Sequence, residues 1–487
     1  MSSRSLSQNF SRTYCNPLAI VDYPMGMDAG KKTEDCDGHW THPVHQSFRE
    51  MADPTVIYED GTWILYPSCG QAWISEDFTT WRHHPLDVKI GYAPTVVKFR
   101  GKFLLTACDT NIFISATPLG PWQDLGPMCD VAGRPVPGWV DPMLFADDDG
   151  RLYAYWGIGG PGISGAEVDA DHPHRLKNPP AIMIKAEPLL RPWERFGANG
   201  EDASQSYLEG PWMFKHAGRY YLTYAAPGTE FHAYGMGAYI GRSPLGPFHY
   251  QQRNPILRSP HGIVTGPGHG CIVRGPGGTI WAFYTCLVRN HHDFERRIGM
   301  DPVGIDANGE LFVHEASTVP QWAPGIQARP EFGNDAGLLP VSVDKRVRAS
   351  SAAPGRDATY ANDLNMRTWW QAGAGDMAPW LEINLRGLFD ISAVRIIWAE
   401  VGLDHDHGII AGAMRYRLEA SMEATGDGWS TVLDRSGNAE DFLIDYRTFA
   451  TVRALRVRLV VLGGPVGMVP SVIDCTVFGR SAALGRS

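Results

Sequence analysis

Short runs of alternating apolar and polar positions fill the first 314 residues, and the runs come in pairs joined by a turn that contains glycine. Each pair begins with a small or acidic residue and a proline, and its second run is rich in aromatic and branched residues. Glycine accepts the positive φ that a tight hairpin requires, and aromatic and β-branched residues suit a pleated sheet. Each pair therefore predicts a β-hairpin. The pairs occur at 52–68, 92–108, 140–157, 208–225 and 265–285.

The hairpins recur in the manner of propeller blades. Further strands are expected after three of them, at 72–81, 112–122 and 238–248. Four-stranded repeats at intervals of roughly 40 residues or more are the signature of a propeller. The five copies therefore predict a five-bladed β-propeller. An irregular sandwich is the alternative, but it does not explain why the proline and the glycine recur in phase.

This symmetry predicts where the chemistry lies. The innermost strands of a propeller line its central channel, so the residues before the repeated prolines are expected to converge at one channel mouth. Those residues are Asp53, Ala93, Asp141 and, shifted by one position, Glu209. Carboxylates from three blades that meet in one funnel raise one another's pKa, which is typical of sites that transfer protons.

The length of 487 residues favours more than one domain. We predict the propeller over residues 14–314 and a linker rich in Pro, Gly and Ala over residues 315–344. From residue 345 to 480 the runs AVRIIWAEV, YRLEASMEA and ALRVRLVVL predict a second β domain, by pattern a β-sandwich. The predicted fold class is therefore all-β.

Composition and charge limit the classes of binding partner and the cellular compartments that we expect for this protein. The net charge of −10 argues against a nucleic-acid partner, and the 16 Trp and 18 Tyr residues suit stacking on sugar rings as well as filling β cores. The N-terminus lacks an apolar run long enough for a signal peptide or a membrane span. We therefore expect a cytoplasmic protein, or a periplasmic or secreted one if a leader was removed. The eight cysteines have no CxxC spacing and predict reduced thiols.

Two long polar segments are expected to shape the channel mouth. The first, residues 22–51, contains three histidines spaced by three: His39, His42 and His45. A metal site is one interpretation, but Pro43 precludes a regular helix there and a fourth ligand is not evident. We favour a loop over the channel mouth that offers His39 and Trp40 to a ligand. The second segment, residues 186–208, directly precedes Glu209.

Taken together, ADPTVI, VDPMLF, LEGPWMF and GPGHG resemble glycoside hydrolase family 43 over residues 14–314. The resemblance implies a five-bladed propeller that cleaves arabinofuranosides, xylosides and related linkages with inversion. The sequence departs from the family in the long segment 22–51 and at Tyr92, where many members have Trp before Ala-Pro.

The resemblance assigns roles to the three acids. Asp53 is the expected general base and Glu209 the expected general acid, while Asp141 tunes the pKa of Glu209 and holds its orientation. The physics agrees, because a neighbouring carboxylate and apolar cover from Trp212 would raise the pKa of Glu209 so that it stays protonated. A simpler interpretation is that Asp53 and Asp141 only cap the starts of strands.

The resemblance also implies further site residues. His269 is expected to help hold a calcium ion or a water molecule at the channel axis. Arg297, or alternatively Arg296, is expected to contact a substrate hydroxyl or the acid pair. The aromatic candidates for sugar contact are Trp40, Trp73, Phe113 and Trp139.

Residues 345–480 resemble a coagulation-factor type C, or discoidin-like, jelly-roll domain and are similar to carbohydrate-binding modules of family 32. ASSAAPGRDATYANDLNMRTWW and PWLEINL carry this likeness. It implies a second calcium ion near residues 361–363, and a domain that docks on the propeller and binds sugar or only supports the fold.

The predicted function is that of an exo-acting, inverting glycoside hydrolase that acts on an oligosaccharide or polysaccharide. The best match is an α-L-arabinofuranosidase that trims plant-type side chains. A β-xylosidase or a β-galactofuranosidase would use the same acids. Two further alternatives are a carbohydrate-binding propeller without catalysis and a metal-dependent hydrolase built on the three histidines between residues 39 and 45.

Overall fold

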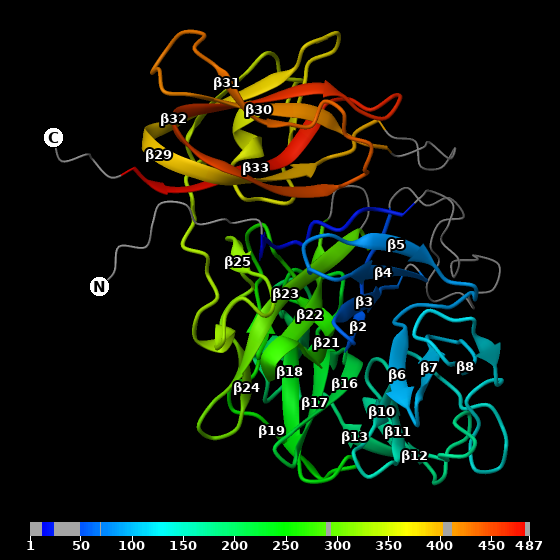
Figure 1. The fold of residues 1–487 in the computed structure, drawn as a ribbon. Helices are drawn as coiled ribbons and strands as arrows, with labels where there is room; N and C mark the ends of the chain where they lie inside the picture. Colours follow the sequence, from blue (N-terminus) through cyan, green and yellow to red (C-terminus); the bar gives the residue numbers. More distant parts are fainter. Residues whose placement is uncertain (1–11, 24–48, 69, 289–293, 403–411, 483–487) are drawn as a thin grey trace.

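The computed structural model describes two β-rich parts, a propeller and a C-terminal β domain (Figure 1). The described residues are 12–23, 49–68, 70–288, 294–402 and 412–482. No helix in these ranges is both long enough and apolar enough to cross a membrane.

Each propeller blade is an antiparallel sheet whose strands follow one another in chain order. Blade one contains β2 (Thr55–Glu59), β3 (Thr62–Tyr66), β4 (Gln71–Ser75) and β5 (Arg82–Pro85). Blade two contains β6 (Thr95–Phe99), β7 (Lys102–Thr106), β8 (Phe113–Ser115) and β9 (Gln123–Asp124). Blade three contains β10 (Met143–Ala146), β11 (Leu152–Trp156), β12 (Ile163–Val168) and β13 (Ala181–Ile184). Blade four contains β16 (Glu209–His216), β17 (Arg219–Ala226), β18 (Gly235–Gly241) and β19 (Phe248–Tyr250), with β20 (Leu257–Arg258) also paired to β18. Blade five contains β21 (Gly268–Arg274), the short 3₁₀ turn η3 (Pro276–Gly278), β22 (Ile280–Leu287), β23 (Arg296–Ile305) and β24 (Leu311–Val313).

The first strands of the blades form a closed ring, which confirms the predicted five-bladed propeller. β2 lies beside β6, β6 beside β10, β10 beside β16 and β16 beside β21, and β21 returns to β2. Each blade contains only strands that follow one another in the chain. No blade combines strands from the two ends of the propeller, so side-chain packing closes the ring. At the closing point Trp63 of blade one packs against Phe283 of blade five, with ring centroids 5.8 Å apart.

A residue in the left-handed region stands at the start of each inner strand. The φ values are +47° at Asp53, +49° at Ala93, +48° at Asp141, +59° at Gly210 and +31° at His269. Such values are uncommon for residues other than glycine, and they recur here at equivalent points of five blades. The repeated sequence pattern therefore marks a repeated backbone bend at the channel mouth.

The segments that connect the blades carry structure of their own. Residues 186–208, expected to be a long loop, include the 3₁₀ turn η2 (Pro192–Glu194) and a hairpin of β14 (Arg195–Phe196) and β15 (Asp202–Ser206). Near the N-terminus β1 (Thr13–Tyr14) pairs with β25 (Gln321–Trp322), so the start of the chain is tied to the segment after blade five. That segment also contains the 3₁₀ turn η4 (Pro330–Phe332).

The C-terminal domain is built on one connected antiparallel sheet with the strand order β26-β33-β29-β32-β30-β31, to which β27 and β28 are added. Its elements are β26 (Leu339–Pro340), β27 (Arg346–Ala349), the 3₁₀ turn η5 (Ala358–Ala361), β28 (Trp370–Gln371), β29 (Trp380–Trp398), β30 (Arg415–Ser421), β31 (Ser430–Asp434), β32 (Ile444–Gly463) and β33 (Ser471–Ser481). β26 lies within the segment expected to be a linker, and it pairs with β33.

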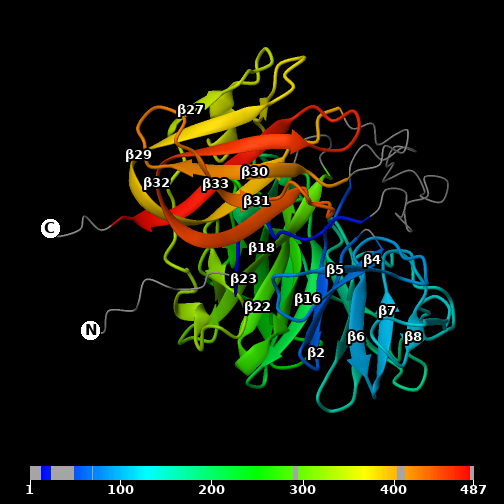
Figure 2. The same ribbon diagram turned by 45° about the horizontal axis from the view of Figure 1, so that its top comes forward.

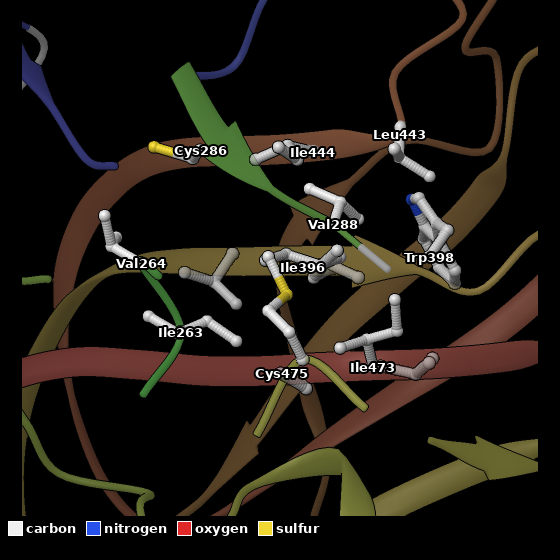
Figure 3. Close-up of a cluster of buried hydrophobic side chains, with 14 of the residues drawn as sticks. Ile263, Val264, Cys286, Val288, Ile396, Trp398, Leu443, Ile444, Ile473 and Cys475 are labelled. Carbon is white, nitrogen blue, oxygen red and sulfur yellow. The ribbon is translucent and has the colours of Figure 1, made fainter. Parts of the chain in front are cut away.

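The C-terminal domain packs on the side of the propeller formed by the first and last blades (Figures 1 and 2). One hydrophobic cluster runs through the contact and combines residues of both parts (Figure 3). On the propeller side it contains Ile263, Val264, Cys286 and Val288, and on the other side Ile396, Trp398, Leu443, Ile444, Ile473 and Cys475. Polar contacts cross as well, because Arg395 donates to the carbonyl oxygens of Asn16 at 2.8 Å and Thr318 at 3.0 Å. The two parts therefore share a core.

The described cysteines are free, as expected from their spacing: Cys15, Cys108, Cys129, Cys271, Cys286 and Cys475. Cys36 and Cys69 lie outside the described residues.

Candidate active site

The start of each inner strand opens onto a narrow cavity at the propeller axis. Asp53, Ala93 and Asp141 line it, together with Trp212 and His269. Its non-atom space is about 240 Å³, open solvent included. The three predicted acids lie close to this point and are 5–7% exposed. Blade symmetry therefore brings together the carboxylates that the sequence pattern singled out.

Asp53 is held by hydrogen bonds to three other segments. Its backbone amide donates to Thr285 Oγ1 at 2.8 Å, and Ser68 Oγ donates to Asp53 Oδ2 at 2.6 Å. Arg296 Nη1 donates to Asp53 Oδ1 at 3.1 Å, so a buried guanidinium balances the carboxylate charge. The position of this carboxylate is thus set by fixed neighbours.

Asp141 lies between Cys108 and the backbone of blade four. The Cys108 thiol donates to Asp141 Oδ1 at 3.3 Å, and the Gly210 amide donates to Asp141 Oδ2 at 3.1 Å. Burial raises the pKa of Asp141, His269 opposes this increase, and Asp53 adds to it. The bond to Gly210 places Asp141 directly beside the residue that follows Glu209.

Glu209 is the first residue of β16 and has the most strongly perturbed carboxyl of the three. Tyr234 donates its hydroxyl hydrogen to Glu209 Oε1. Burial raises the pKa of Glu209 well above its usual range, and the charge of Asp141 raises it further, while the hydrogen bond from Tyr234 opposes the shift. Burial and a neighbouring carboxylate both favour the protonated form of this carboxyl group.

His269 occupies the centre of the cluster. Its Nδ1 lies 3.3 Å from Asp53 Oδ1 and 3.5 Å from Asp141 Oδ2. The backbone of Gly210 approaches the imidazole so closely that a Cβ at this position would lie 2.6 Å from the ring. Blade four therefore requires glycine at 210, both for its positive φ and for the space that His269 fills.

A calcium ion at the channel axis stays a prediction, because the protein offers it few ligands there. Calcium takes six to eight oxygen ligands, whereas the cavity beside His269 offers the carboxylates of Asp53 and Asp141 and a few threonine hydroxyls. Among the described residues no three His, Cys, Asp or Glu side chains are placed to hold a metal. The buried Oγ1 of Thr95 has no hydrogen-bond partner in the described structure, which suits a bound water molecule.

The second expected calcium position, at residues 361–363, has polar atoms that serve the local fold. Asp363 accepts from the Asn365 amide at 2.9 Å and from Thr368 Oγ1 at 2.7 Å. The side chain of Asn362 donates to the carbonyl oxygen of Ser342 at 2.8 Å.

The arginine that faces the acids is Arg296, and the preference for Arg297 was wrong. Arg296 contacts Asp53 and is also ion-paired with Glu50, which is buried. Arg297 points away from the acids, donating to the carbonyl oxygen of Arg49 and lying 3.5 Å from Asp22. Neighbours on a strand face opposite sides, so only one of the two arginines can face the channel.

Three of the four aromatic residues predicted to contact sugar are core residues. Trp73, Phe113 and Trp139 are each at most 9% exposed and belong to three different hydrophobic clusters. The indole of Trp73 donates to the carbonyl oxygen of Val21, and that of Trp139 donates to Thr106 Oγ1. These contacts leave the three rings unavailable to a sugar. His39 and Trp40 lie outside the described residues.

Several residues of the site carried no signal in the sequence pattern. They are Glu50, Ser68, Cys108, Tyr234 and Thr285. Glu50 and Tyr234 lie outside the predicted hairpins, whereas Ser68, Cys108 and Thr285 are the last residues of three of them, away from the acid–proline positions. A search for polar residues at the channel ends of the second and third blade strands would have found Ser68, Cys108 and Thr285.

Two carboxyl groups of the cluster lie in different environments. Asp53 lies against a guanidinium and hydroxyl donors, while Glu209 lies in a buried position beside another carboxylate. Such a pair can accept a proton at one point and donate one at another.

Comparisons with known proteins agree with this geometry. A family model described as "Glycosyl hydrolases family 43" matches residues 52–311. The chain is 25% identical over 278 residues to "Beta-D-galactofuranosidase xynD" of Aspergillus niger, covering 48% of this chain and 73% of that protein. It is 26% identical over 324 residues to a "Beta-xylosidase" of Xylanibacter ruminicola, covering 58% of this chain and 89% of the relative. The crystal structure of a thermostable family-43 glycoside hydrolase superposes with a TM-score of 0.50 at 22% identity, covering 65% of this chain and all of that one.

Proposed function

The chain belongs to glycosyl hydrolases family 43, whose members are inverting glycoside hydrolases, and from this premise we propose that it is an exo-acting glycosidase with Asp53 as general base and Glu209 as general acid. Its substrate is a carbohydrate. The best candidate for the released unit is a terminal α-L-arabinofuranosyl group on a plant-type side chain or oligosaccharide.

The observation that carries this proposal is the difference between the environments of Asp53 and Glu209. Inversion in one step requires a carboxylate that takes a proton from water and a protonated carboxyl that gives one to the leaving oxygen. Arg296 pairs with Asp53, whereas burial and the charge of Asp141 raise the pKa of Glu209. The surroundings of Glu209 therefore favour the protonated form that a general acid needs, and the guanidinium beside Asp53 lies where it can stabilise a carboxylate.

In this proposal each neighbour has a stated task. Asp53 accepts a proton from a water molecule as that water attacks the anomeric carbon. Glu209 donates its proton to the glycosidic oxygen as the bond to the aglycone breaks. Asp141 keeps Glu209 protonated before the reaction through its negative charge, and His269 lies between Asp53 and Asp141.

The choice of sugar rests on the relatives. Proteins similar to this chain are named as a β-galactofuranosidase, a β-xylosidase and, at 28% identity over 200 residues, an arabinoxylan arabinofuranohydrolase of Bacillus subtilis. These names support three terminal sugars that the same pair of acids could release. The expected exo mode rests only on the length of the polar segments 22–51 and 186–208 in the sequence.

An assay of the purified protein on aryl α-L-arabinofuranoside, β-D-xyloside and β-D-galactofuranoside tests the proposal. We expect hydrolysis of one of them, and a loss of roughly 10²-fold or more in Glu209→Ala. Glu59→Ala, at the far end of β2, is the matched control and should keep wild-type activity. Equal rates in Glu209→Ala and wild type would remove Glu209 as the acid. Binding of these sugars without hydrolysis would favour a carbohydrate-binding propeller.

A further inference from the structure

Two segments of the propeller touch both the candidate base and the C-terminal domain. One is the stretch 49–53, which ends at Asp53. The other is the hairpin of β22 and β23, whose second strand begins at Arg296. The two segments are bonded to each other, because the amide of Met51 donates to the carbonyl oxygen of Arg296 at 3.1 Å.

The C-terminal domain holds the first segment through buried charges. The guanidinium of Arg49 lies 3.0 Å from Glu400 and 2.6 Å from Asp441, two carboxylates of that domain, and 3.4 Å from Asp22. The Arg49 side chain is only 1% exposed. A buried guanidinium that moved away from these carboxylates would leave charges without a partner, which is costly. These contacts therefore fix the position of Arg49.

Glu50, the residue after Arg49, connects the buried ion cluster with the active site. Glu50 is fully buried, and its carboxylate binds the guanidinium of Arg296 and accepts from the hydroxyl of Tyr92 at 3.1 Å. Arg296 in turn donates to Asp53 Oδ1 at 3.1 Å. Two ion pairs thus connect a residue next to the domain contact with the candidate base.

The hairpin of blade five is held by apolar packing. Cys286 and Val288 lie in the cluster shared with Ile396 and Ile473 of the C-terminal domain (Figure 3). Cys286 is paired with Arg297 across the hairpin, one position from the pair of Leu287 with Arg296. The same domain therefore steadies both the strand that carries Arg296 and the segment that carries Glu50.

We propose that the C-terminal domain is a positioning element of the active site: Glu400 and Asp441 fix Arg49, and through Glu50 and Arg296 they hold the carboxylate of Asp53 in place. This inference rests on the proposed role of Asp53 as general base. A base acts on water in the transition state and not on the bound sugar. Loss of its positioning therefore lowers kcat and leaves KM nearly unchanged.

The test compares the full-length double variant Glu400→Gln/Asp441→Asn with wild type on the aryl glycoside that wild type cleaves. We expect kcat to fall by about tenfold or more and KM to change by less than about twofold, because small misplacements of reacting groups are costly. The control is Asp390→Asn, which removes a carboxylate that pairs with partly exposed Arg453 in the same domain. It should match wild type in both constants.

Asp441→Asn alone is the milder variant should the double variant not fold, since the Asp441 side chain is 19% exposed. We expect a loss of about threefold in kcat from it. An unchanged kcat with a lower unfolding midpoint would overturn the inference and leave the domain a purely stabilising role. A raised KM at constant kcat would also overturn it, in favour of direct contact with the substrate. Failure of the proposed function differs from both, since wild type itself would then cleave none of the three glycosides.

Discussion

The hydroxyl group of Tyr234 donates a hydrogen bond to Oε1 of Glu209 inside the carboxylate cluster. Both side chains are buried, and the tyrosine ring lies so close to Gly268 that a Cβ there would be 2.1 Å from it. The tyrosine is therefore locked in place by the backbone of blade five. Its bond favours the ionised form of Glu209, against burial and the charge of Asp141, which favour the protonated form.

Tyr234→Phe should move the basic limb of the pH–activity profile to higher pH. The hydrogen bond from Tyr234 lowers the pKa of Glu209, so its removal raises that pKa and keeps the acid protonated over a wider range. The measurement is kcat/KM against pH on the cleaved aryl glycoside, since this limb reports the acid of the free enzyme. A basic limb that stays in place or moves to lower pH would contradict the assignment of Glu209 as the acid.

Asp141→Asn should move the same limb in the opposite direction. The charge of Asp141 raises the pKa of Glu209, so a neutral amide lowers it, and Glu209 loses its proton at lower pH. The amide oxygen can still accept from the Gly210 amide, which bonds to Asp141 at 3.1 Å, so the local backbone should keep its shape. The same profile measures the effect, and a shift to higher pH would show that Asp141 does not act through its charge.

The positions of the three acids could be predicted because they belong to a repeat. A residue with positive φ before a proline marks the channel mouth in the first three blades, at Asp53, Ala93 and Asp141. Once the repeat is interpreted as a propeller, blade symmetry alone predicts that the three acids converge at the channel mouth. In blade four the bend falls on Gly210, which is why Glu209 is displaced by one position in the sequence pattern.

The choice between Arg296 and Arg297 could not be made in this way. The sequence predicts a strand there, but its phase depends on register, and the register pairs Leu287 with Arg296 and Cys286 with Arg297. A shift of one residue would exchange the faces of the two arginines. The prediction that Trp73 contacts sugar was wrong for a related reason. Trp73 lies on β4, the third strand of its blade, where side chains fill the space between sheets.

Cys108→Ala should reduce activity, and Cys108→Ser should largely preserve it. The thiol donates to Asp141 Oδ1 at 3.3 Å, and its sulfur accepts from the Asp141 amide at 3.1 Å. Burial and the nearby carboxylate raise the pKa of Cys108 well above its usual range, so the group stays a thiol and a donor. A serine hydroxyl can replace both bonds and a methyl group cannot.

A lost hydrogen bond to a charged group is worth about 1.5–3 kcal/mol, so we expect kcat/KM of Cys108→Ala to fall by about tenfold or more. The serine variant should stay within about threefold of wild type by the same reasoning. Equal losses in the two variants would mean that the size of the sulfur, and not its hydrogen bonds, holds Asp141.

Asp301→Asn should make the protein more stable at alkaline pH without changing it at acidic pH. Asp301 lies on β23 of blade five, and its Oδ2 accepts from Tyr284 at 2.6 Å, from the Ser317 amide at 2.9 Å and from Asn16 at 3.2 Å. Burial raises the pKa of Asp301 from its ordinary value of 3.8 to about 7. The folded protein therefore binds a proton here more tightly than the unfolded chain does.

Because the folded pKa is the higher one, this group contributes stability that is fully present below about pH 4 and is lost as the pH rises to about 7. Asparagine copies the protonated acid, with one acceptor and one donor, and does not ionise. Urea unfolding at pH 5 and pH 8 should show a smaller loss of free energy for Asp301→Asn than for wild type. Other titrating groups cancel in this difference, and the Asp390→Asn variant, changed at a partly exposed carboxylate, should follow wild type. Equal pH dependence in all three proteins would place the ionisation of Asp301 outside this pH range.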